Sequence, residues 1–448
     1  MTTAQARPPR WVIIGAGWSG LACAVQAVQQ GVAVTLLDAA PAVGGRARRV
    51  DLRIGERDFT LDNGQHLLLG ACTETIALMR RLGVEPEQAL LSQPFMVRYP
   101  DGWTLGAARL PAPLHLALGL VRARGPSWSD RVALAAWVRR QKRRQWELGD
   151  DCPVAGLFES QSASLVRRLW RPLCIAAMNA EPERASARLF LNMLRLSMGG
   201  AESDSHLLLT RRDLSSTMPE AALRYLDQRG AIVRLRQPAV ALSRSGSGWS
   251  VTLREERIEA DRIVLAVAAD SAARLLESAS MHALDAAISE LRGLQYEPLA
   301  TVYLRYPPGT RLPAALYALL DEPARGSYGQ WAFDRGRIDP AHEGIVSVVI
   351  GGPALAFERD RVALCSASDR QLTREFGLPP SIAQNAVIER RATLLPSVGL
   401  RRPPARLPVD GLYLAGDVAA SAFPSTLEGS VRAGLEAAQL ALSDAAAN

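Results

Sequence analysis

A short apolar run followed by a glycine-rich turn near the amino terminus constrains the fold of this chain most strongly. Residues 11–14 (WVII) precede the sequence GAGWSG at residues 15–20, and an apolar stretch follows. Gly15 permits a tight turn, Gly17 lets backbone N–H groups approach a pyrophosphate, and Gly20 allows close packing of helix on strand. We therefore predict strand, turn and helix, with phosphates at the positive end of the helix dipole.

A second predicted strand, residues 32–37, ends at Asp38, which lies 18 residues beyond Gly20. A carboxylate at this place is suited to the two hydroxyls of an adenosine ribose. A glycine-rich turn alone is weak evidence, since it can be only a turn. The two strands, the helix and the acid together favour dinucleotide binding.

The carboxyl-terminal segment supplies a second half for the same site. The sequence GLYLAGD at residues 411–417 is typical of an apolar strand that ends in Gly-Asp, and FPSTLEGS follows at residues 423–430. A helix continuing to Leu440 would point its amino end back at the Gly-Asp turn. Further strands are expected at residues 230–235 and 262–267.

These motifs, with Gly44-Gly45-Arg46, resemble the glutathione-reductase-like flavoproteins, particularly the amine oxidase and carotenoid desaturase superfamily. The resemblance implies FAD, with Arg46 along the phosphates, Asp417 near the ribityl chain or pyrophosphate, and a helix end facing the flavin. A flexible glycine loop with a solvated arginine is the simpler alternative for residues 44–46. The cofactor residues so assigned are Gly15, Ala16, Gly17, Trp18, Ser19, Gly20, Asp38, Ala39, Gly44, Gly45, Arg46, Gly64, Gln65, His66, Val240, Gly416, Asp417, Thr426, Leu427 and Glu428. Val240 is assigned by position rather than by a motif.

Two internal stretches carry a more specific resemblance. They are LDNGQHLLLGAC at residues 61–72 and LWRPLCIAAMNAEPERASARLFLNMLRLS at residues 169–197. Together with the carboxyl-terminal motif they resemble the hydroxysqualene dehydroxylase family, the squalene-associated FAD-dependent desaturases of bacterial hopanoid pathways, from about Val12 to Leu440. The family implies reduction of hydroxysqualene to squalene by reduced FAD. Val418 departs from the family, which more often has an aromatic residue there.

Loss of a hydroxyl group requires a proton donor, because hydroxide is a poor leaving group. The titratable side chains in segments expected near the flavin are Asp62, His66 and Glu428. His66 is the first candidate, and the alternative is a histidine that only bonds backbone or cofactor. Trp331 and Phe333 are candidates for an aromatic wall beside an allylic cation, although inward packing of an alternating strand explains them equally well.

The predicted fold class is α/β, with a glutathione-reductase-like, Rossmann-type FAD-binding domain that is discontinuous in sequence. We expect residues 1–95, 206–285 and 388–448 to form this domain. Residues 96–205 and 286–387 would form a mixed α+β domain for the lipid substrate. Two rival functions stay open: a desaturase or amine oxidase of the same superfamily, and a non-catalytic prenyl-lipid carrier on the same fold.

The expected partner is a long-chain isoprenoid lipid. The net charge of +7 is carried mostly by arginines that we interpret as scattered along the chain, and without a nucleic-acid-binding motif it does not predict nucleic acid as a partner. No second nucleotide fingerprint is present for NADPH, so the electron donor is unidentified. We found no spacing of His, Cys and Glu that predicts a metal site, and the five cysteines stand in no paired spacing.

The cellular location is predicted from the amino-terminal residues and from the length of the apolar segments. Residues 1–9 lack an apolar stretch typical of a signal peptide, and no segment is apolar for long enough to predict a membrane span. We therefore expect a cytoplasmic protein. Residues 129–146 read as a helix with a basic end, either an interfacial helix at the inner face of the cytoplasmic membrane or an ordinary solvated helix.

Overall fold

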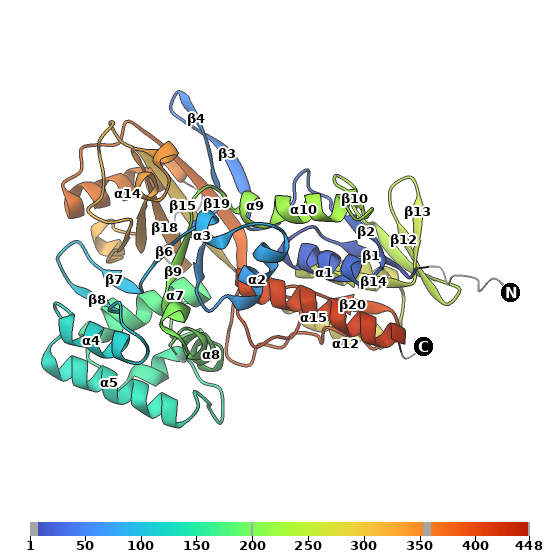
Figure 1. Cartoon of the computed structure of the whole chain (residues 1–448), viewed down its shortest axis with the longest axis horizontal. Coiled ribbons are helices and arrows are strands. Elements are labelled where there is room, and N and C mark those ends of the chain that lie inside the picture. The colour runs from blue at the N-terminus through green and yellow to red at the C-terminus, as the bar shows by residue number, and fades with distance from the viewer. Residues whose placement is uncertain (1–7, 199, 353–359, 447–448) are drawn as a thin grey trace.

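A five-stranded parallel sheet gathers strands from the start, middle and end of the chain (Figure 1). The computed structural model describes residues 8–198, 200–352 and 360–446. In spatial order the strands are β10 (Ile232–Arg234), β2 (Ala33–Leu37), β1 (Arg10–Ile14), β14 (Arg262–Leu265) and β20 (Leu412–Leu414). Ile14 lies in register with Leu37 on one side and Leu265 on the other, so the carboxyl ends of these strands meet at one edge. The predicted α/β fold is confirmed.

The two faces of this sheet are covered by different elements. Alternate residues of each strand point to opposite faces, and accordingly Ile13 and Ile14 belong to separate buried clusters. One face carries α1 (Trp18–Gln29), α10 (Pro219–Asp227) and α15 (Leu427–Ala446); the other carries α11 (Ala269–Ser278), α12 (Asp285–Arg292) and the antiparallel strands β11 (Ala241–Ser245), β12 (Gly248–Thr252) and β13 (Arg257–Ala260). This burial on both faces explains why the strands read as uninterrupted apolar runs.

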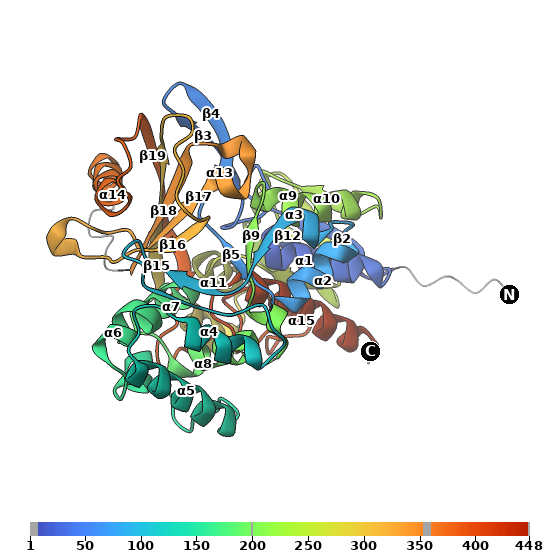
Figure 2. The same ribbon diagram turned by 60° about the vertical axis from the view of Figure 1, so that its left-hand side comes forward.

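A second five-stranded sheet is antiparallel and stands beside the first (Figure 2). Its order is β16 (Leu316–Ala318), β17 (Trp331–Asp334), β18 (Ile345–Gly351), β15 (Tyr296–Arg305) and β19 (Ala383–Leu394). The residues Val302, Ala332 and Val348 share one face and pack in the same cluster as Leu364 and Leu372 of α14 (Arg361–Phe376). Trp331 and Val349 point to the opposite face, toward a group of helices.

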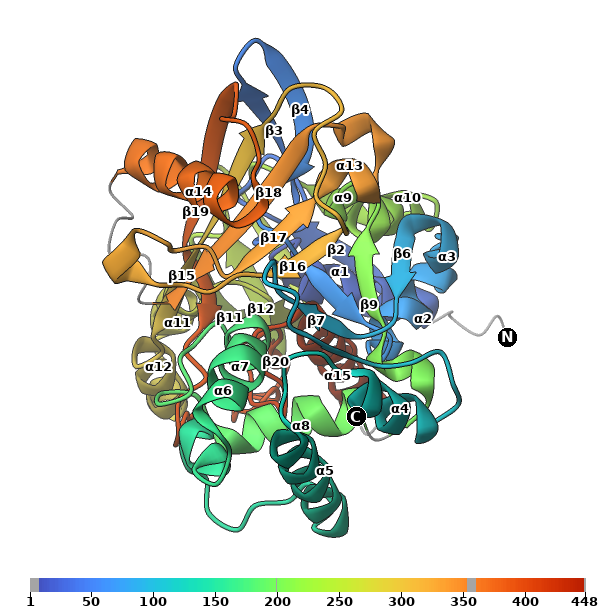
Figure 3. The same ribbon diagram turned by 90° about the vertical axis from the view of Figure 1, so that its left-hand side faces the viewer.

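These helices lie below the antiparallel sheet in Figure 3 and surround an aromatic core. They are α4 (Leu114–Arg122), α5 (Trp128–Arg143), α6 (Ala163–Leu165), α7 (Arg171–Met178) and α8 (Ala187–Met198). The rings of Phe158 and Trp170 stack with centroids 4.2 Å apart, and Trp137 packs on both. The Trp and Phe residues of this region therefore hold the helices together.

Smaller elements connect the two sheets. One of them is the antiparallel hairpin of β3 (Arg49–Ile54) and β4 (Arg57–Asp62). The others are β5 (Leu67–Leu69), β6 (Leu90–Gln93), β7 (Met96–Arg98), β8 (Thr104–Gly106), β9 (Leu207–Thr210), α2 (Thr73–Arg81), α3 (Pro86–Ala89), α9 (Leu214–Thr217) and α13 (Arg335–Ile338). Strand β5, the Leu67-Leu68-Leu69 run, pairs with β9 and so carries the chain from the hairpin into the interior.

Among the described residues, no helix has both the length and the hydropathy needed to cross a bilayer. Residues 1–7, most of the stretch interpreted as lacking a signal peptide, lie outside the described ranges.

Candidate functional site

One cavity of about 960 Å³ runs between the two sheets and the helices. Of the residues assigned to the cofactor, the cavity is lined by Gly15, Gly17, Trp18, Ser19, Asp38, Ala39, Gly44, Gly45, Arg46, Gly64, Gln65, His66, Val240, Gly416, Asp417, Thr426, Leu427 and Glu428. Ala16, Gly20 and the catalytic candidate Asp62 do not line it. Segments far apart in sequence thus contribute to one site.

The glycines of the first turn are required by close backbone contacts. Gly15 has a φ of +110°, and a Cβ atom there would lie 2.2 Å from the carbonyl oxygen of Ala266. A Cβ atom on Gly20 would lie 1.8 Å from the carbonyl oxygen of Gly15. At Gly17, by contrast, the nearest atom to such a Cβ is 3.9 Å away, so this position borders open space. Gly15 and Gly20 shape the turn, and Gly17 keeps the backbone open to a ligand.

The amino terminus of α1 presents unsatisfied donors to the cavity. Gly17 stands at the N-cap, no side chain caps the helix, and its first turn holds no acidic residue. The buried hydroxyl of Ser19 has no partner among the described residues. Free N–H groups, a hydroxyl and the helix dipole together form an anion site that fits a pyrophosphate.

Arg46 and Asp417 meet across this site from opposite ends of the chain. The Arg46 guanidinium lies 2.7 Å from Oδ1 of Asp417, and Oδ2 accepts a 2.8 Å hydrogen bond from the Ser425 hydroxyl. The Asn63 amide donates to the carbonyl oxygen of Arg46 at 2.8 Å and so fixes the loop that presents the guanidinium. The solvated-arginine alternative for residues 44–46 does not describe this geometry.

Asp38 and Val240 lie where an adenosine end would be expected. Oδ2 of Asp38 accepts from the Ala16 N–H at 2.6 Å and Oδ1 from the Ala40 N–H at 2.7 Å. Each carboxylate oxygen retains a lone pair for a ribose hydroxyl. The N–H of Val240 donates to the carbonyl of Thr252, so this N–H is not free for a base.

The imidazole of His66 is held in a defined orientation. Its Nδ1 lies 2.9 Å from the carbonyl oxygen of Gly64, and a carbonyl can only accept, so Nδ1 carries the hydrogen. Desolvation lowers the pKa of His66 to about 4, although the bond to Gly64 opposes this effect. At neutral pH the ring is therefore neutral, with a lone pair on Nε2 and part of its surface on the cavity.

Asp62 is buried beneath the site rather than in it. Its Oδ1 accepts from the N–H of Leu214 at 2.8 Å, and its carbonyl accepts from the Tyr303 hydroxyl at 2.7 Å. Burial raises the pKa of Asp62 to about 7, an effect that Arg335 and the Leu214 N–H partly oppose. These contacts favour a structural role in joining β4 to α9.

Glu428 lines the cavity, but protein donors occupy its carboxylate. Oε2 accepts from the Thr75 N–H at 2.9 Å and the Thr75 hydroxyl at 2.7 Å, and Oε1 accepts from the Glu74 N–H at 3.1 Å. Arg432 donates to Oε1 as well, at 2.7 Å. Because α2 has no side-chain cap of its own, Glu428 satisfies its first-turn N–H groups. This geometry favours an anchor of α2 over a proton donor.

The remainder of the cavity is apolar. Trp331 and Phe333 point into it from β17, with Leu316 and Val349 on the adjacent strands of the same sheet face. Leu173, Phe190, Met193 and Leu194 line it from α7 and α8. Such a lining accommodates a long hydrocarbon and excludes water.

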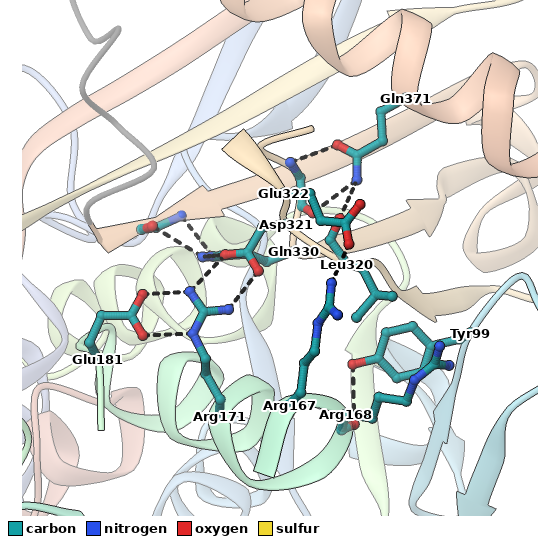
Figure 4. Close-up of polar contacts among 12 residues, drawn as sticks. Tyr99, Arg167, Arg168, Arg171, Glu181, Leu320, Asp321, Glu322, Gln330 and Gln371 are labelled. Atoms are coloured by element: carbon teal, nitrogen blue, oxygen red, sulfur yellow. Dashed lines mark hydrogen bonds and ion pairs between the residues drawn. The ribbon is translucent and has the colours of Figure 1, made fainter. Parts of the chain in front are cut away.

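A polar network beside the cavity, with one member on the cavity wall, supports this apolar lining (Figure 4). The Arg171 guanidinium bonds to both carboxylate oxygens of Glu181, at 2.8 and 2.6 Å, and to both of Asp321, at 2.5 and 2.9 Å. Gln330, which lines the cavity, donates to Asp321 at 3.1 Å and to the carbonyl of Gly351 at 3.2 Å. The network joins α7 to the second sheet.

Asn179 is a cavity residue that the sequence reasoning missed. It ends α7 with a left-handed φ of +49° and donates to the Thr393 hydroxyl at 3.0 Å and to the carbonyl of Pro298 at 3.2 Å. Its Oδ1 has no partner among the described residues. An asparagine directly after a helical pattern favours the left-handed conformation, so the position of Asn179 in the sequence could have indicated this helix end.

Known proteins share this architecture. A cyclohexylamine oxidase from Brevibacterium oxydans superposes with a TM-score of 0.69 at 18% identity, covering 98% of this chain and 100% of the other, which shows the fold. Hydroxysqualene dehydroxylases from Sinorhizobium fredii and Rhodopseudomonas palustris are each 28% identical to the chain over 96% of its length. The matches cover 98% and 97% of those relatives.

The model of the flavin containing amine oxidoreductase family matches residues 18–442. FAD is therefore the dinucleotide that the cradle binds, and the open end of α1, the unpartnered Ser19 hydroxyl and the space at Gly17 fit its pyrophosphate. The chain belongs to the flavin containing amine oxidoreductase family and is an FAD-dependent oxidoreductase.

Proposed function

We propose that this enzyme converts hydroxysqualene to squalene. The observation that carries the proposal is the single cavity that joins the dinucleotide cradle at Arg46 and Asp417 to the apolar wall at Trp331 and Phe333. The two relatives named hydroxysqualene dehydroxylase, matched over nearly their whole length, support this substrate. Reduction of a long apolar alcohol requires both a bound flavin and an apolar lining, and this cavity provides the cradle for the first and the wall for the second.

The reaction replaces a hydroxyl group by hydrogen. Reduced FAD, when bound, supplies the hydride. The hydroxyl leaves as water after taking up one proton, so the carbon–oxygen bond breaks and one carbon–hydrogen bond forms. Residues that would hold the cofactor are Ser19, Arg46 and Asp417, together with the amino termini of α1 and α15. The protein contributes position and dryness.

His66 has a different part in this proposal from the one that its residue type suggested. Since Nδ1–H is bonded to Gly64 and the pKa of the ring is about 4, Nε2 can accept a hydrogen bond but has no proton to donate at neutral pH. We propose that Nε2 accepts the hydrogen of the substrate hydroxyl and orients its carbon–oxygen bond. The proton that the leaving hydroxyl takes up then comes from a donor other than His66, Asp62 or Glu428.

The neighbouring side chain of Gln65 completes a polar edge on the cavity. The Ser347 hydroxyl donates to Oε1 of Gln65 at 3.0 Å, and the backbone N–H of Gln65 lies 3.3 Å from the Thr301 hydroxyl. Its Nε2 has no partner among the described residues. In this proposal Nε2 donates to the cofactor or to the substrate oxygen.

The experiment is an anaerobic incubation of the FAD-loaded enzyme with hydroxysqualene and chemically reduced flavin, followed by gas chromatography of the lipid extract. We expect squalene in amounts that scale with enzyme. An FAD-loaded enzyme that forms no squalene, but oxidises squalene or an amine under air, would replace the proposal by the desaturase or amine oxidase function. A colourless protein that takes up no FAD would instead revive the carrier.

We further propose the division into two domains given by the sequence, residues 1–95, 206–285 and 388–448 for FAD and the remainder for lipid. The five parallel strands all fall in the first set, and the antiparallel sheet draws four of its strands from residues 286–387 and β19 from both sides of that boundary.

A further inference from the structure

Helices α4 and α5 expose large apolar side chains on one side of the molecule, and the two helices lie next to each other in Figures 1 and 3. The exposed fractions are 58% for Leu114, 57% for Val121, 69% for Trp128 and 66% for Val132. The other eight tryptophans are buried. A tryptophan that is 69% exposed beside exposed aliphatic side chains belongs to an apolar patch of the kind that marks an interaction site.

The basic excess of the chain is concentrated in the same place. Residues 102–146 hold nine Lys and Arg residues and one acidic residue, so this segment carries +8 and the rest of the chain −1. The one acid, Asp130, closes the capping box of α5 with Ser127 and is buried. The other 43 Lys and Arg residues are spread over the rest of the chain, where 44 acidic residues offset them. Helices α4 and α5 themselves carry no exposed carboxylate; the exposed Asp101 and Glu147 flank the segment at its two ends.

A single arginine joins the apolar ends of the two helices. The Arg131 guanidinium donates to the carbonyls of Val121 and Ala123, each at 2.7 Å, and lies 4.5 Å from the centre of the Trp128 ring. Along α5, exposed positions 128, 132, 135, 139 and 143 follow one stripe, apolar at first and basic at the end. We name Leu114, Val121, Trp128, Val132, Arg139 and Arg143 the α4–α5 surface.

Helix α4 separates this surface from the cavity. Leu116 lines the cavity, whereas Leu114 and Val121 of the same helix face solvent. Gly119 lies so close to β8 that a Cβ atom would be 1.8 Å from the carbonyl oxygen of Gly106, so α4 packs tightly on β8, which pairs with the cavity-lining strand β7. Helix α4 alone therefore separates the apolar cavity from the apolar part of the α4–α5 surface.

We propose that the α4–α5 surface docks on an anionic lipid bilayer, with its apolar side chains in the interface and its arginines at the headgroups. The combination of an exposed tryptophan, aliphatic neighbours and a basic end without carboxylates fits such a bilayer. A nucleic acid would use the cations but leave Leu114, Val121 and Val132 without a role. This docking is independent of the proposed reaction.

Flotation with FAD-loaded enzyme tests the docking without any turnover. We expect binding to vesicles of phosphatidylcholine with phosphatidylglycerol, weaker binding to phosphatidylcholine alone, and a loss of binding as salt rises. Val121→Ser with Val132→Ser should weaken binding about tenfold, and Arg139→Gln with Arg143→Gln should do the same on anionic vesicles only. Val362→Ser, at a 76% exposed position on α14, is the matched control and should bind like wild type.

Trp128 provides an internal reporter. Adding anionic vesicles should shift tryptophan emission to the blue and protect it from acrylamide, and Trp128→Phe should abolish the shift. Equal binding by wild type and the Val121→Ser/Val132→Ser variant would overturn the proposal, as would binding that only the arginine substitutions reduce, which would indicate an acidic polymer. A dimer in light scattering that Trp128→Ser dissociates would also overturn it, in favour of a second copy of the chain.

Discussion

The guanidinium of Arg46 lies 2.7 Å from the carboxylate of Asp417, so the first and last segments of the chain meet at the cofactor site. Only 5% of the Asp417 side chain is exposed. An unpaired buried carboxylate beside a pyrophosphate would repel the cofactor, and Arg46 prevents this. The pair is thus part of the cradle as well as a link between distant segments.

Arg46→Ala should lower the affinity for FAD by roughly tenfold to a hundredfold, because it removes a charge-assisted contact and leaves Asp417 uncompensated. Arg46→Lys should recover part of the loss. Fluorescence titration of the apoprotein with FAD measures both. Arg391→Ala is the control. Both Arg46 and Arg391 lie near the ring of Tyr296, but Arg391 pairs with the exposed Asp270 instead of Asp417. Equal affinities for the Ala variants at 46 and 391 would contradict the role of Arg46.

His66→Asn should keep the absorption spectrum of bound FAD but slow squalene formation by roughly tenfold or more, because the acceptor for the substrate hydroxyl is displaced. With a pKa near 4, the wild-type rate should show no inflection from this ring between pH 5 and 8. His282→Asn, at an almost fully exposed histidine, is the control. A wild-type rate that falls as pH rises through 6 to 7, and a His66→Asn rate that does not, would instead identify imidazolium as the proton donor.

Some parts of the site could be predicted from the sequence alone, and others could not. The GAGWSG turn and the Gly-Asp turn were predictable because each is a local strand–turn–helix pattern. The contact that requires Gly15 was not predictable, because it is with the carbonyl of Ala266, far away in sequence. The role of Glu428 was not, because the α2 N–H groups that it caps are about 350 residues away in sequence. Burial, which sets the pKa values of His66 and Asp62 in opposite directions, is likewise a property of the assembled fold.

Asp62→Asn should change how stability depends on pH. The folded pKa of Asp62 is raised from 3.8 to about 7, so its contribution is complete below about pH 4 and is lost as pH rises through 7. Relative to Asp62→Asn, wild type should lose about 2 to 3 kcal/mol of unfolding free energy between pH 5 and pH 8. The Asn side chain still accepts from Leu214. The lowered pKa of His66 makes the unfolding free energy rise with pH between 4 and 6.5. Both proteins contain His66, so the difference between their unfolding free energies isolates the effect of Asp62.

Urea unfolding of both proteins at pH 5 and pH 8 measures this difference. Asp58→Asn, on an exposed position of the same hairpin, should track wild type at both values. If the gap between wild type and Asp62→Asn is the same at pH 5 and pH 8, the pKa of Asp62 in the folded protein is not raised.

Arg171→Met should destabilise the protein by about 2 to 3 kcal/mol, because it leaves the carboxylates of Glu181 and Asp321 without their shared cation. Since Asp321 also accepts from Gln330 on the cavity wall, the Michaelis constant for the lipid should rise more than the turnover number falls. Arg167→Met is the matched control: its partner Glu322 sits on the same loop, but the Arg167 side chain is 53% exposed and such pairs contribute little. In a double-mutant cycle, Arg171→Met should cost much less when Asp321 is already Asn. Equal unfolding free energies for the variants at 171 and 167 would mean that this network does not fix the apolar wall.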